Sequence, residues 1–130
     1  MRIILDTNLL ISALLSKNLR ERLEIVVIEP NLNLLVCNEL LDEFYNVIQR
    51  PKFNKYISQS QLNDYMKFLQ PRFNYIQLIS KIDMCRDRAD NFLLALAKDG
   101  NADYLITGDN DLLVLSNFEQ TRIVTLINKY

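Results

Sequence analysis

Short apolar runs alternate along this chain with longer segments in which apolar residues recur every three or four positions. Runs of this length predict buried β-strands, because the strands of a parallel sheet are covered on both faces and carry few polar residues. The runs lie at residues 2–5, 32–36, 75–79, 104–107 and 122–126. The sequence therefore predicts a sheet of four to five strands.

The segments between these runs have the spacing of amphipathic helices. In one of them Leu40 and Phe44 lie one helical turn apart. Asn38 is a favourable N-cap for this helix, and Pro51 predicts its end just after Arg50. Other helices are predicted at residues 9–15, 20–28, 60–69 and 90–98, with a helical turn at 112–115. This alternation predicts an α/β fold, a three-layer α/β/α sandwich with a mostly parallel sheet.

Acidic residues follow the first predicted strand and the strand at 104–107. Asp6 comes directly after the first, and Asp109 and Asp111 come shortly after the other. Ligands of open α/β sheets bind at the carboxyl ends of the strands, so these carboxylates would meet at one edge. Each acid also has a structural interpretation: Asp6 could cap the next helix, and the segment Gly108-Asp109-Asn110-Asp111 could form a turn.

Two further acids lie on predicted helices. Glu43 adjoins the apolar face of its helix, whereas Asp42 lies farther round toward solvent, so a role in the site is favoured for Glu43, with a solvated acidic face as the alternative. Asp90 could complete a capping box with Asp87 as the N-cap. The same position would aim Asp90 at the sheet edge, so capping and metal binding are both open for this residue.

Composition narrows the chemistry that such a site could perform. The chain has 130 residues, a formal net charge of −1 and no histidine. The absence of histidine excludes histidine-based acid–base catalysis, Ser–His or Cys–His nucleophile pairs and histidine-ligated zinc. Carboxylates alone suit Mg²⁺ or Mn²⁺. Cys37 and Cys85 lack a metal-binding spacing and fit reduced thiols of a cytoplasmic protein, and no apolar run predicts a membrane span or a signal peptide.

Five blocks of the sequence carry a family resemblance. They are Ile4-Leu5-Asp6-Thr7-Asn8, Leu40-Leu41-Asp42-Glu43, Asn46-Val47-Ile48-Gln49-Arg50-Pro51-Lys52-Phe53, Asp87-x-x-Asp90-Asn91-Phe92-Leu93 and Ala102-Asp103-Tyr104-Leu105-Ile106-Thr107-Gly108-Asp109-x-Asp111-Leu112. Together they resemble the PIN domain, and especially its bacterial VapC-like branch, the toxins of toxin–antitoxin pairs. The blocks span the chain nearly end to end, so the resemblance implies one PIN-like nuclease domain over residues 1–130.

The resemblance also implies a Mg²⁺- or Mn²⁺-dependent ribonuclease and assigns site residues. The family's four acidic positions fall on Asp6, Glu43, Asp90 and Asp109. An accessory acid and two supporting polar residues fall on Asp111, Asn8 and Thr107. Relatives often carry a small hydroxyl residue at the position of Cys37, so a hydrogen bond made there is expected to be weaker or missing in this chain.

RNA would need contacts to its phosphates and bases. The candidate phosphate contacts are Arg50, Lys52, Lys55, Arg86 and Arg88, and the candidate stacking residues are Tyr45, Phe53 and Tyr56. Solvated charges and core aromatics are the alternative interpretation for each of them. The resemblance further implies a small antitoxin that blocks the site, and a homodimer.

Two other functions are weighed against a ribonuclease. A noncatalytic PIN-fold module that binds metal, RNA or protein is the first, and the intact set of four acids argues against it. A phosphoacceptor receiver domain is the second. It would need an acidic pair after the first strand and a lysine after a late strand, whereas Thr7 and Asn8 follow Asp6, and Gly108 and Asp109 follow Thr107.

Overall fold

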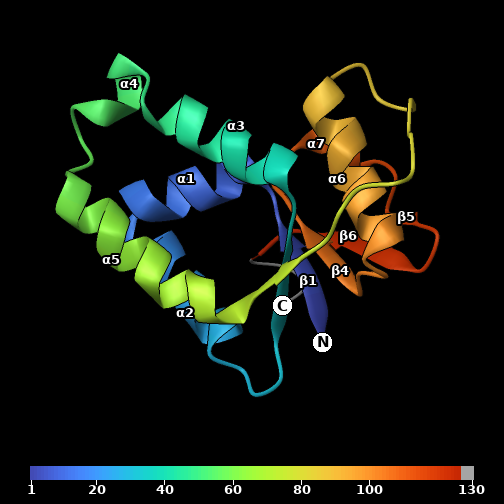
Figure 1. Cartoon of the computed structure of the whole chain (residues 1–130), viewed down its shortest axis with the longest axis horizontal. Helices are drawn as coiled ribbons and strands as arrows, with labels where there is room; N and C mark the ends of the chain where they lie inside the picture. The colour runs from blue at the N-terminus through green and yellow to red at the C-terminus, as the bar shows by residue number, and fades with distance from the viewer. Residues whose placement is uncertain (127–130) are drawn as a thin grey trace.

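A single six-stranded sheet runs through the molecule. The computed structural model describes residues 1–126 of the chain (Figure 1). The strands are β1 (Arg2–Leu5), β2 (Asn33–Val36), β3 (Phe73–Tyr75), β4 (Tyr104–Ile106), β5 (Asn117–Phe118) and β6 (Thr121–Val124), in the order β3-β2-β1-β4-β6-β5. All neighbouring strands are parallel except β5 and β6. The mostly parallel sheet is confirmed, with six strands rather than the expected four to five.

Helices lie on both sides of this sheet. They are α1 (Thr7–Leu15), α2 (Lys17–Val27), α3 (Asn38–Ile48), α4 (Pro51–Asn54), α5 (Gln59–Leu69), the 3₁₀ turn η1 (Gln70–Arg72), α6 (Arg88–Asp99) and α7 (Asn110–Leu113). In Figure 1, α1, α2 and α5 lie on one side of the strands and α6 on the other. Helix α3 packs against both α1 and α6. The α/β layered fold is confirmed, and no helix of residues 1–126 is long and apolar enough to cross a membrane.

The strand expected at residues 75–79 is displaced. Strand β3 pairs with β2 from Phe73 to Tyr75, and the Ile76 N–H still donates to the Val36 carbonyl at 2.8 Å. The chain then runs on without a strand partner in the described region, but the side chains of Ile76 and Leu78 pack on the core and Ile79 is exposed. This alternating burial explains why the sequence here has the pattern of a strand.

Helix α3 begins and ends differently from the expectation. Cys37, not Asn38, is its N-cap, and it makes no side-chain capping bond, as expected for a thiol at this position. The helix ends at Ile48, and Pro51 starts the short helix α4 instead of only ending α3. Proline is favoured at a first helical position because its missing N–H would have no partner there.

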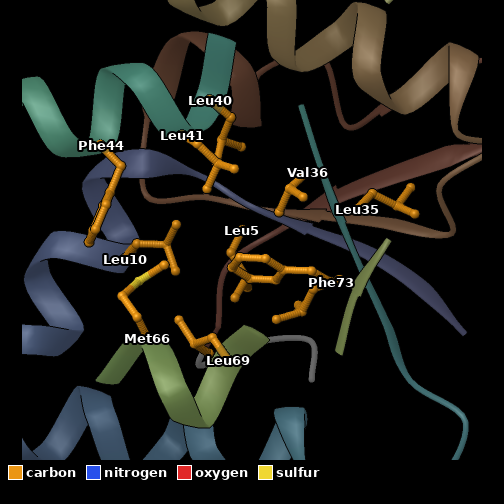
Figure 2. A pocket seen from close by; sticks show the side chains of 11 residues that line it. Leu5, Leu10, Leu35, Val36, Leu40, Leu41, Phe44, Met66, Leu69 and Phe73 are labelled. Carbon is orange, nitrogen blue, oxygen red and sulfur yellow. The ribbon is translucent and has the colours of Figure 1, made fainter. Parts of the chain in front are cut away.

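A packed apolar core fixes α3 over the sheet. Figure 2 shows Leu40 and Phe44 of α3 and Met66 and Leu69 of α5 lining one apolar pocket, with Leu5 of β1 between them. Phe44, Leu40 and Leu69 are each 1% exposed. A cavity of about 20 Å³ remains between them, and its apolar lining offers a water molecule no partner. This packing holds the helix that carries Glu43.

Candidate metal centre

The carboxyl ends of β1 and β4 place Asp6 beside Thr107. The two strands are paired with Leu5 opposite Ile106, and the Asp6 N–H donates to the Ile106 carbonyl at 3.0 Å. The chain leaves β1 toward β2 on one side and meets β4 on the other, so this is the switch point of the sheet. The Thr107 hydroxyl donates to Asp6 Oδ2 at 2.6 Å and accepts the Asp109 N–H at 3.0 Å. Thr107 thus joins the two strand ends.

Asp6 and Asp109 also cap helices, so the structural interpretation holds for both. Asp6 Oδ1 accepts the Asn8 N–H at 3.3 Å as the N-cap of α1. Asp109 Oδ1 accepts the Asp111 N–H at 2.9 Å as the N-cap of α7. Capping occupies one oxygen of each carboxylate. The position of Asn8 therefore supports Asp6 through its backbone, while its side chain is exposed.

The expected capping box at α6 is not formed, although its N-cap is Asp87 as expected. Asp87 is the N-cap and accepts the Ala89 N–H at 2.9 Å. Asp90 occupies the third helical position and is 4% exposed, but it accepts no hydrogen bond from the Asp87 backbone. Its Oδ2 is buried without any hydrogen-bond partner in the part of the chain that the structure describes. A buried carboxylate oxygen without a donor is a candidate ligand for a cation.

Three acids form a compact group at this edge. One carboxylate oxygen from each of Asp90, Asp109 and Asp111 lies within 4.8 Å of the others. Asp6 and Glu43 lie outside this group, but Glu43 Oε2 is buried and, within residues 1–126, has no hydrogen-bond partner. The structure thus brings together Asp90 and Asp109 of the four expected acids and adds the accessory Asp111.

The pKa values show how closely the acids interact. Burial and then the charge of Asp109 raise the pKa of Asp90 to about 7. Burial raises the pKa of Asp6, which the Thr107 hydroxyl partly lowers and the charge of Asp109 raises again. Burial and the charges of Asp6 and Asp87 raise the pKa of Glu43. Such mutual repulsion is relieved when a cation binds, so the residues fit a divalent metal.

The expected basic residues lie at different distances from the acids. Arg86 forms an exposed ion pair with Asp111 at 3.8 Å, and Arg50 lies close enough to Glu43 to lower its pKa. Arg88 and Arg50 line a broad groove between α3, α6 and the segment 78–83. In and after α4, Lys52 lies over the Phe53 ring and Lys55 over the Tyr56 ring, each at 5.1 Å. These aromatic contacts are local, and the Tyr45 ring packs edge-on against Phe44 at 5.4 Å.

Sequence reasoning missed two neighbours of the site. Asp87 was interpreted only as a cap, yet its charge raises the pKa of both Glu43 and Asp90. Burial raises the pKa of the Cys85 thiol, and so do the charges of the three grouped acids. Asn91, next to Asp90, holds this loop by accepting the Cys85 N–H at 2.8 Å and donating to the Cys85 carbonyl at 3.0 Å. In the sequence, the block Asp90-Asn91 was the signal from which these two neighbours of the site could have been found.

The comparisons with known proteins agree with this architecture. Residues 2–111 match the family model described as the PIN domain. The chain belongs to the PIN domain family. An uncharacterised protein of Methanocaldococcus jannaschii is 29% identical over 119 residues, which cover 88% of this chain and 74% of that protein.

A solved structure shares the fold of this PIN domain. It is a chain in the crystal structure of VapBC2 from Rickettsia felis bound to a DNA fragment from their promoter, with a TM-score of 0.64. The match covers 95% of this chain and 97% of the other, at 18% sequence identity. The resemblance of the sequence to the PIN domain is thus confirmed at the level of family and fold.

Proposed function

We propose that this PIN domain is a Mg²⁺- or Mn²⁺-dependent endoribonuclease, with residues 1–130 forming one nuclease domain. One observation carries the proposal: Asp90, with its buried and unpartnered Oδ2, meets Asp109 and Asp111 at the sheet edge. When bound, the ion would supply positive charge for the phosphate oxygens and lower the pKa of a coordinated water. Histidine, the common alternative for that proton transfer, does not occur in the sequence.

Each acid has a separate role in this proposal. Asp90, Asp109 and Asp111 would hold the ion, because one carboxylate oxygen of each lies within 4.8 Å of the other two. Asp6 would complete the shell, held in place by the Thr107 hydroxyl at 2.6 Å. Glu43 would hold a second ion or orient the attacking water, since its Oε2 has no other partner in the described chain.

The RNA would reach the acids along their basic border. Four or more carboxylates repel a phosphate, so the substrate would bind well only with the cation in place. Arg50 near Glu43 and Arg86 near Asp111 flank the acids on two sides. The further proposed phosphate contacts are Lys52, Lys55 and Arg88, which are exposed.

The partners are proposed from the family and from the solved relative. The Rickettsia felis relative is a VapBC2 complex. We therefore propose that this chain is the toxin of a toxin–antitoxin pair, that a small antitoxin covers the acidic site, and that the active form is a homodimer in the cytoplasm.

Cleavage assays with one isosteric variant test the enzyme. Single-stranded RNA, structured RNA and DNA are incubated with the protein in Mg²⁺, Mn²⁺ or EDTA. Asp6→Asn keeps one oxygen to accept the Asn8 N–H, and its amide N–H can donate to the Thr107 hydroxyl, but it loses its charge. We therefore expect cleavage to fall about 1,000-fold or more. RNA should be cut and DNA spared.

The outcomes separate the candidate functions. Cutting that persists in EDTA or in Asp6→Asn protein purified in parallel would point to a contaminating nuclease and contradict the proposal. Metal binding without cleavage of any substrate would favour the noncatalytic binding module.

A further inference from the structure

Asn91, the residue after Asp90, fixes the loop before α6 to the helix. Its Oδ1 accepts two consecutive N–H groups, from Met84 at 3.0 Å and from Cys85 at 2.8 Å, and its Nδ2 donates to the Cys85 carbonyl at 3.0 Å. Asparagine has an acceptor and two donors on a short side chain, so it can bond to both backbone groups of one residue. An ionised aspartate could accept the N–H groups but could not donate to the carbonyl. Asn91 thus pairs with Cys85 as a neighbouring backbone would.

The loop is also fixed at its other end. Asp87 is the N-cap of α6 and accepts the Ala89 N–H at 2.9 Å. Arg86 is the one residue between Cys85, which Asn91 holds, and this cap. The backbone of Arg86 is therefore restricted from both sides, while its side chain is 93% exposed. A side chain on a fixed backbone loses less conformational entropy when it binds a ligand.

Arg86 extends from this loop to the acidic edge of the sheet. Its guanidinium forms the ion pair with Asp111 at 3.8 Å. Asp111 belongs to the group of three acids whose carboxylate oxygens lie within 4.8 Å of one another, and Asp90 is another member. The contacts therefore close a ring, from Asn91 through the loop and Arg86 to Asp111, and back to Asp90, the neighbour of Asn91. The loop position that Asn91 fixes thus sets the place of the Arg86 charge beside the acids.

We propose that Asn91 is a positioning residue, which holds the loop so that Arg86 contacts a phosphate of the RNA bound at the acids. The inference rests on the proposed function. The exposed pair between Arg86 and Asp111 contributes little to stability, so the guanidinium can exchange this partner for a phosphate at low cost. A guanidinium binds a phosphate best through two parallel N–H groups, and this geometry requires a loop that is held in place. Asn91 would act through Arg86 and not on the reacting atoms.

A double-mutant cycle between Asn91 and Arg86 tests this coupling. Binding of a short fluorescein-labelled single-stranded RNA is measured by fluorescence anisotropy in Ca²⁺, which binds carboxylate oxygens as Mg²⁺ does, and gels check that the RNA stays intact. We expect Asn91→Ala and Arg86→Ala each to weaken binding about 5-fold, and the double variant to bind no more weakly than either single variant. Each change should also reduce the steepness of log affinity against log salt by about 0.7, the value for one phosphate contact to a single strand.

Three further measurements separate positioning from a general loss of structure. Hydrogen exchange of the Met84 and Cys85 N–H groups should be faster in Asn91→Ala, whereas the middle of α6 should stay protected. Arg22→Ala, which removes an exposed arginine of α2, should leave RNA binding unchanged alone and in combination with Asn91→Ala. In cleavage assays with Mn²⁺, Asn91→Ala should raise KM about 5-fold with little change in kcat, because Asp90 stays in place.

The outcomes distinguish the inference from the proposed function. Weaker binding by both single variants, with no further loss in the double variant, supports the inference. Additive losses would overturn it, because Asn91 would then act without Arg86. Unchanged binding by Arg86→Ala would overturn it too, and this exposed substitution does not put folding at risk. The expected cycle in RNA binding without any cleavage by the wild type would overturn the ribonuclease and keep the role of Asn91. No RNA binding by the wild type would overturn both.

Discussion

The two ends of helix α6 carry aspartates in opposite situations. Asp90 lies in the first turn, and Asp99 is the last residue. The helix dipole would favour a negative charge at the first position and disfavour one at the second. The structure has the reverse, because the pKa of Asp90 is raised to about 7 and that of Asp99 is lowered. Local groups therefore outweigh the dipole at both ends.

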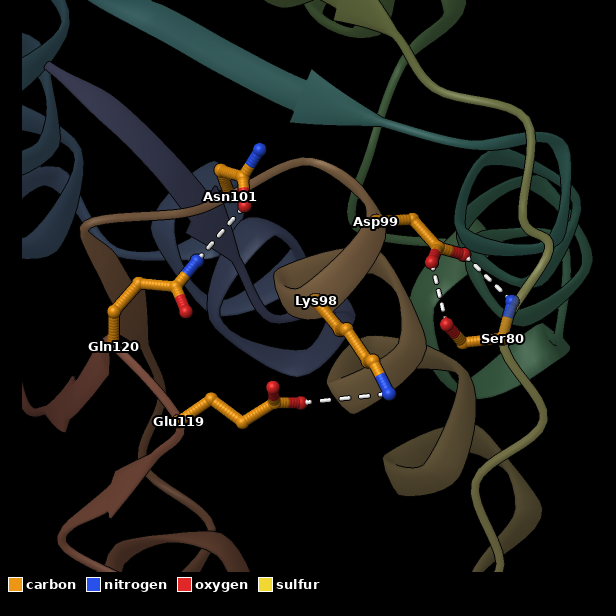
Figure 3. A network of polar contacts seen from close by, with 6 residues as sticks. All are labelled: Ser80, Lys98, Asp99, Asn101, Glu119 and Gln120. Atoms are coloured by element: carbon orange, nitrogen blue, oxygen red, sulfur yellow. Dashed lines mark hydrogen bonds and ion pairs between the residues drawn. The ribbon is translucent and has the colours of Figure 1, made fainter.

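The number of hydrogen-bond donors explains the difference. Burial alone would raise the pKa of Asp99, but donors reach both of its oxygens. Its Oδ2 accepts the Ile79 N–H at 2.6 Å. Figure 3 shows the two bonds from Ser80, whose N–H donates to Oδ2 at 2.9 Å and whose hydroxyl donates to Oδ1 at 2.6 Å. Asp90 has a buried oxygen without a donor and is next to Asp109. A carboxylate with donors fastens a segment, whereas one without them is ready to bind a cation.

Addition of metal should produce the largest change at one end of α6 only. A ligand that binds only the folded state at 100 times its dissociation constant stabilises it by about 2.7 kcal/mol. We expect saturating Mn²⁺ to raise the free energy of unfolding of the wild type and of Asp99→Ala by about this amount. Asp109→Asn, which loses a charge from the acidic group, should gain much less. Urea unfolding with Mn²⁺ and with EDTA measures this. Equal gains in all three proteins would mean that the ion binds elsewhere.

Neutralising Asp90 should stabilise the metal-free protein. In Asp90→Asn the amide can donate to Asp109, where wild-type Asp90 is repelled, so we expect the free energy of unfolding in EDTA at pH 8 to rise by about 1–3 kcal/mol. The raised pKa of Asp90 means that the folded state holds more protons than the unfolded one from about pH 4 to pH 7. The stability of the wild type therefore falls as the pH rises through this window, and the gain from Asp90→Asn grows.

Urea titrations at pH 5 and pH 8 check the sign. A loss of stability in Asp90→Asn at pH 8 would show that the carboxylate acts mainly at the start of α6.

The contrast also marks what sequence reasoning could reach. Acids after β1 and β4 must meet because neighbouring parallel strands end at the same edge, so Asp6 and Asp109 were predictable. The apolar face of α3 indicated the direction of Glu43. Whether a carboxylate keeps a free oxygen depends on donors that come from distant segments. Asp87 therefore had the pattern of a cap, and the effect of its charge on the pKa of Glu43 was not evident.

The segment held by Asp99 shows the same limit. Residues 75–79 have the alternation of a strand, but β3 ends at Tyr75, and the last bond to β2 is the one from the Ile76 N–H to the Val36 carbonyl. The Ile79 and Ser80 N–H groups bond to the Asp99 side chain instead of to a neighbouring strand. A side chain about twenty positions away in the sequence thus replaces a strand partner. Local sequence patterns do not indicate that a distant side chain takes the place of a neighbouring strand.

Removing Asp99 should have the smallest effect. Asp99→Ala deletes the acceptor of three hydrogen bonds, but the freed donors of Ile79 and Ser80 are near the surface, where water replaces most of the loss. We therefore expect the free energy of unfolding to fall by about 1 kcal/mol at pH 7.

Because the pKa of Asp99 is lowered in the folded state, its contribution is present above the pKa of an unfolded aspartate and is lost as the pH falls through the folded value. The difference in the free energy of unfolding between the wild type and Asp99→Ala should thus shrink in acid. The difference for Asp90→Asn shrinks in acid too, but it has the opposite sign, because that variant is the more stable protein. Asp64→Ala, an exposed acid on α5, serves as the control in urea titrations. A neutral Asp99→Ala would mean that the segment 76–82 is held by its apolar contacts alone.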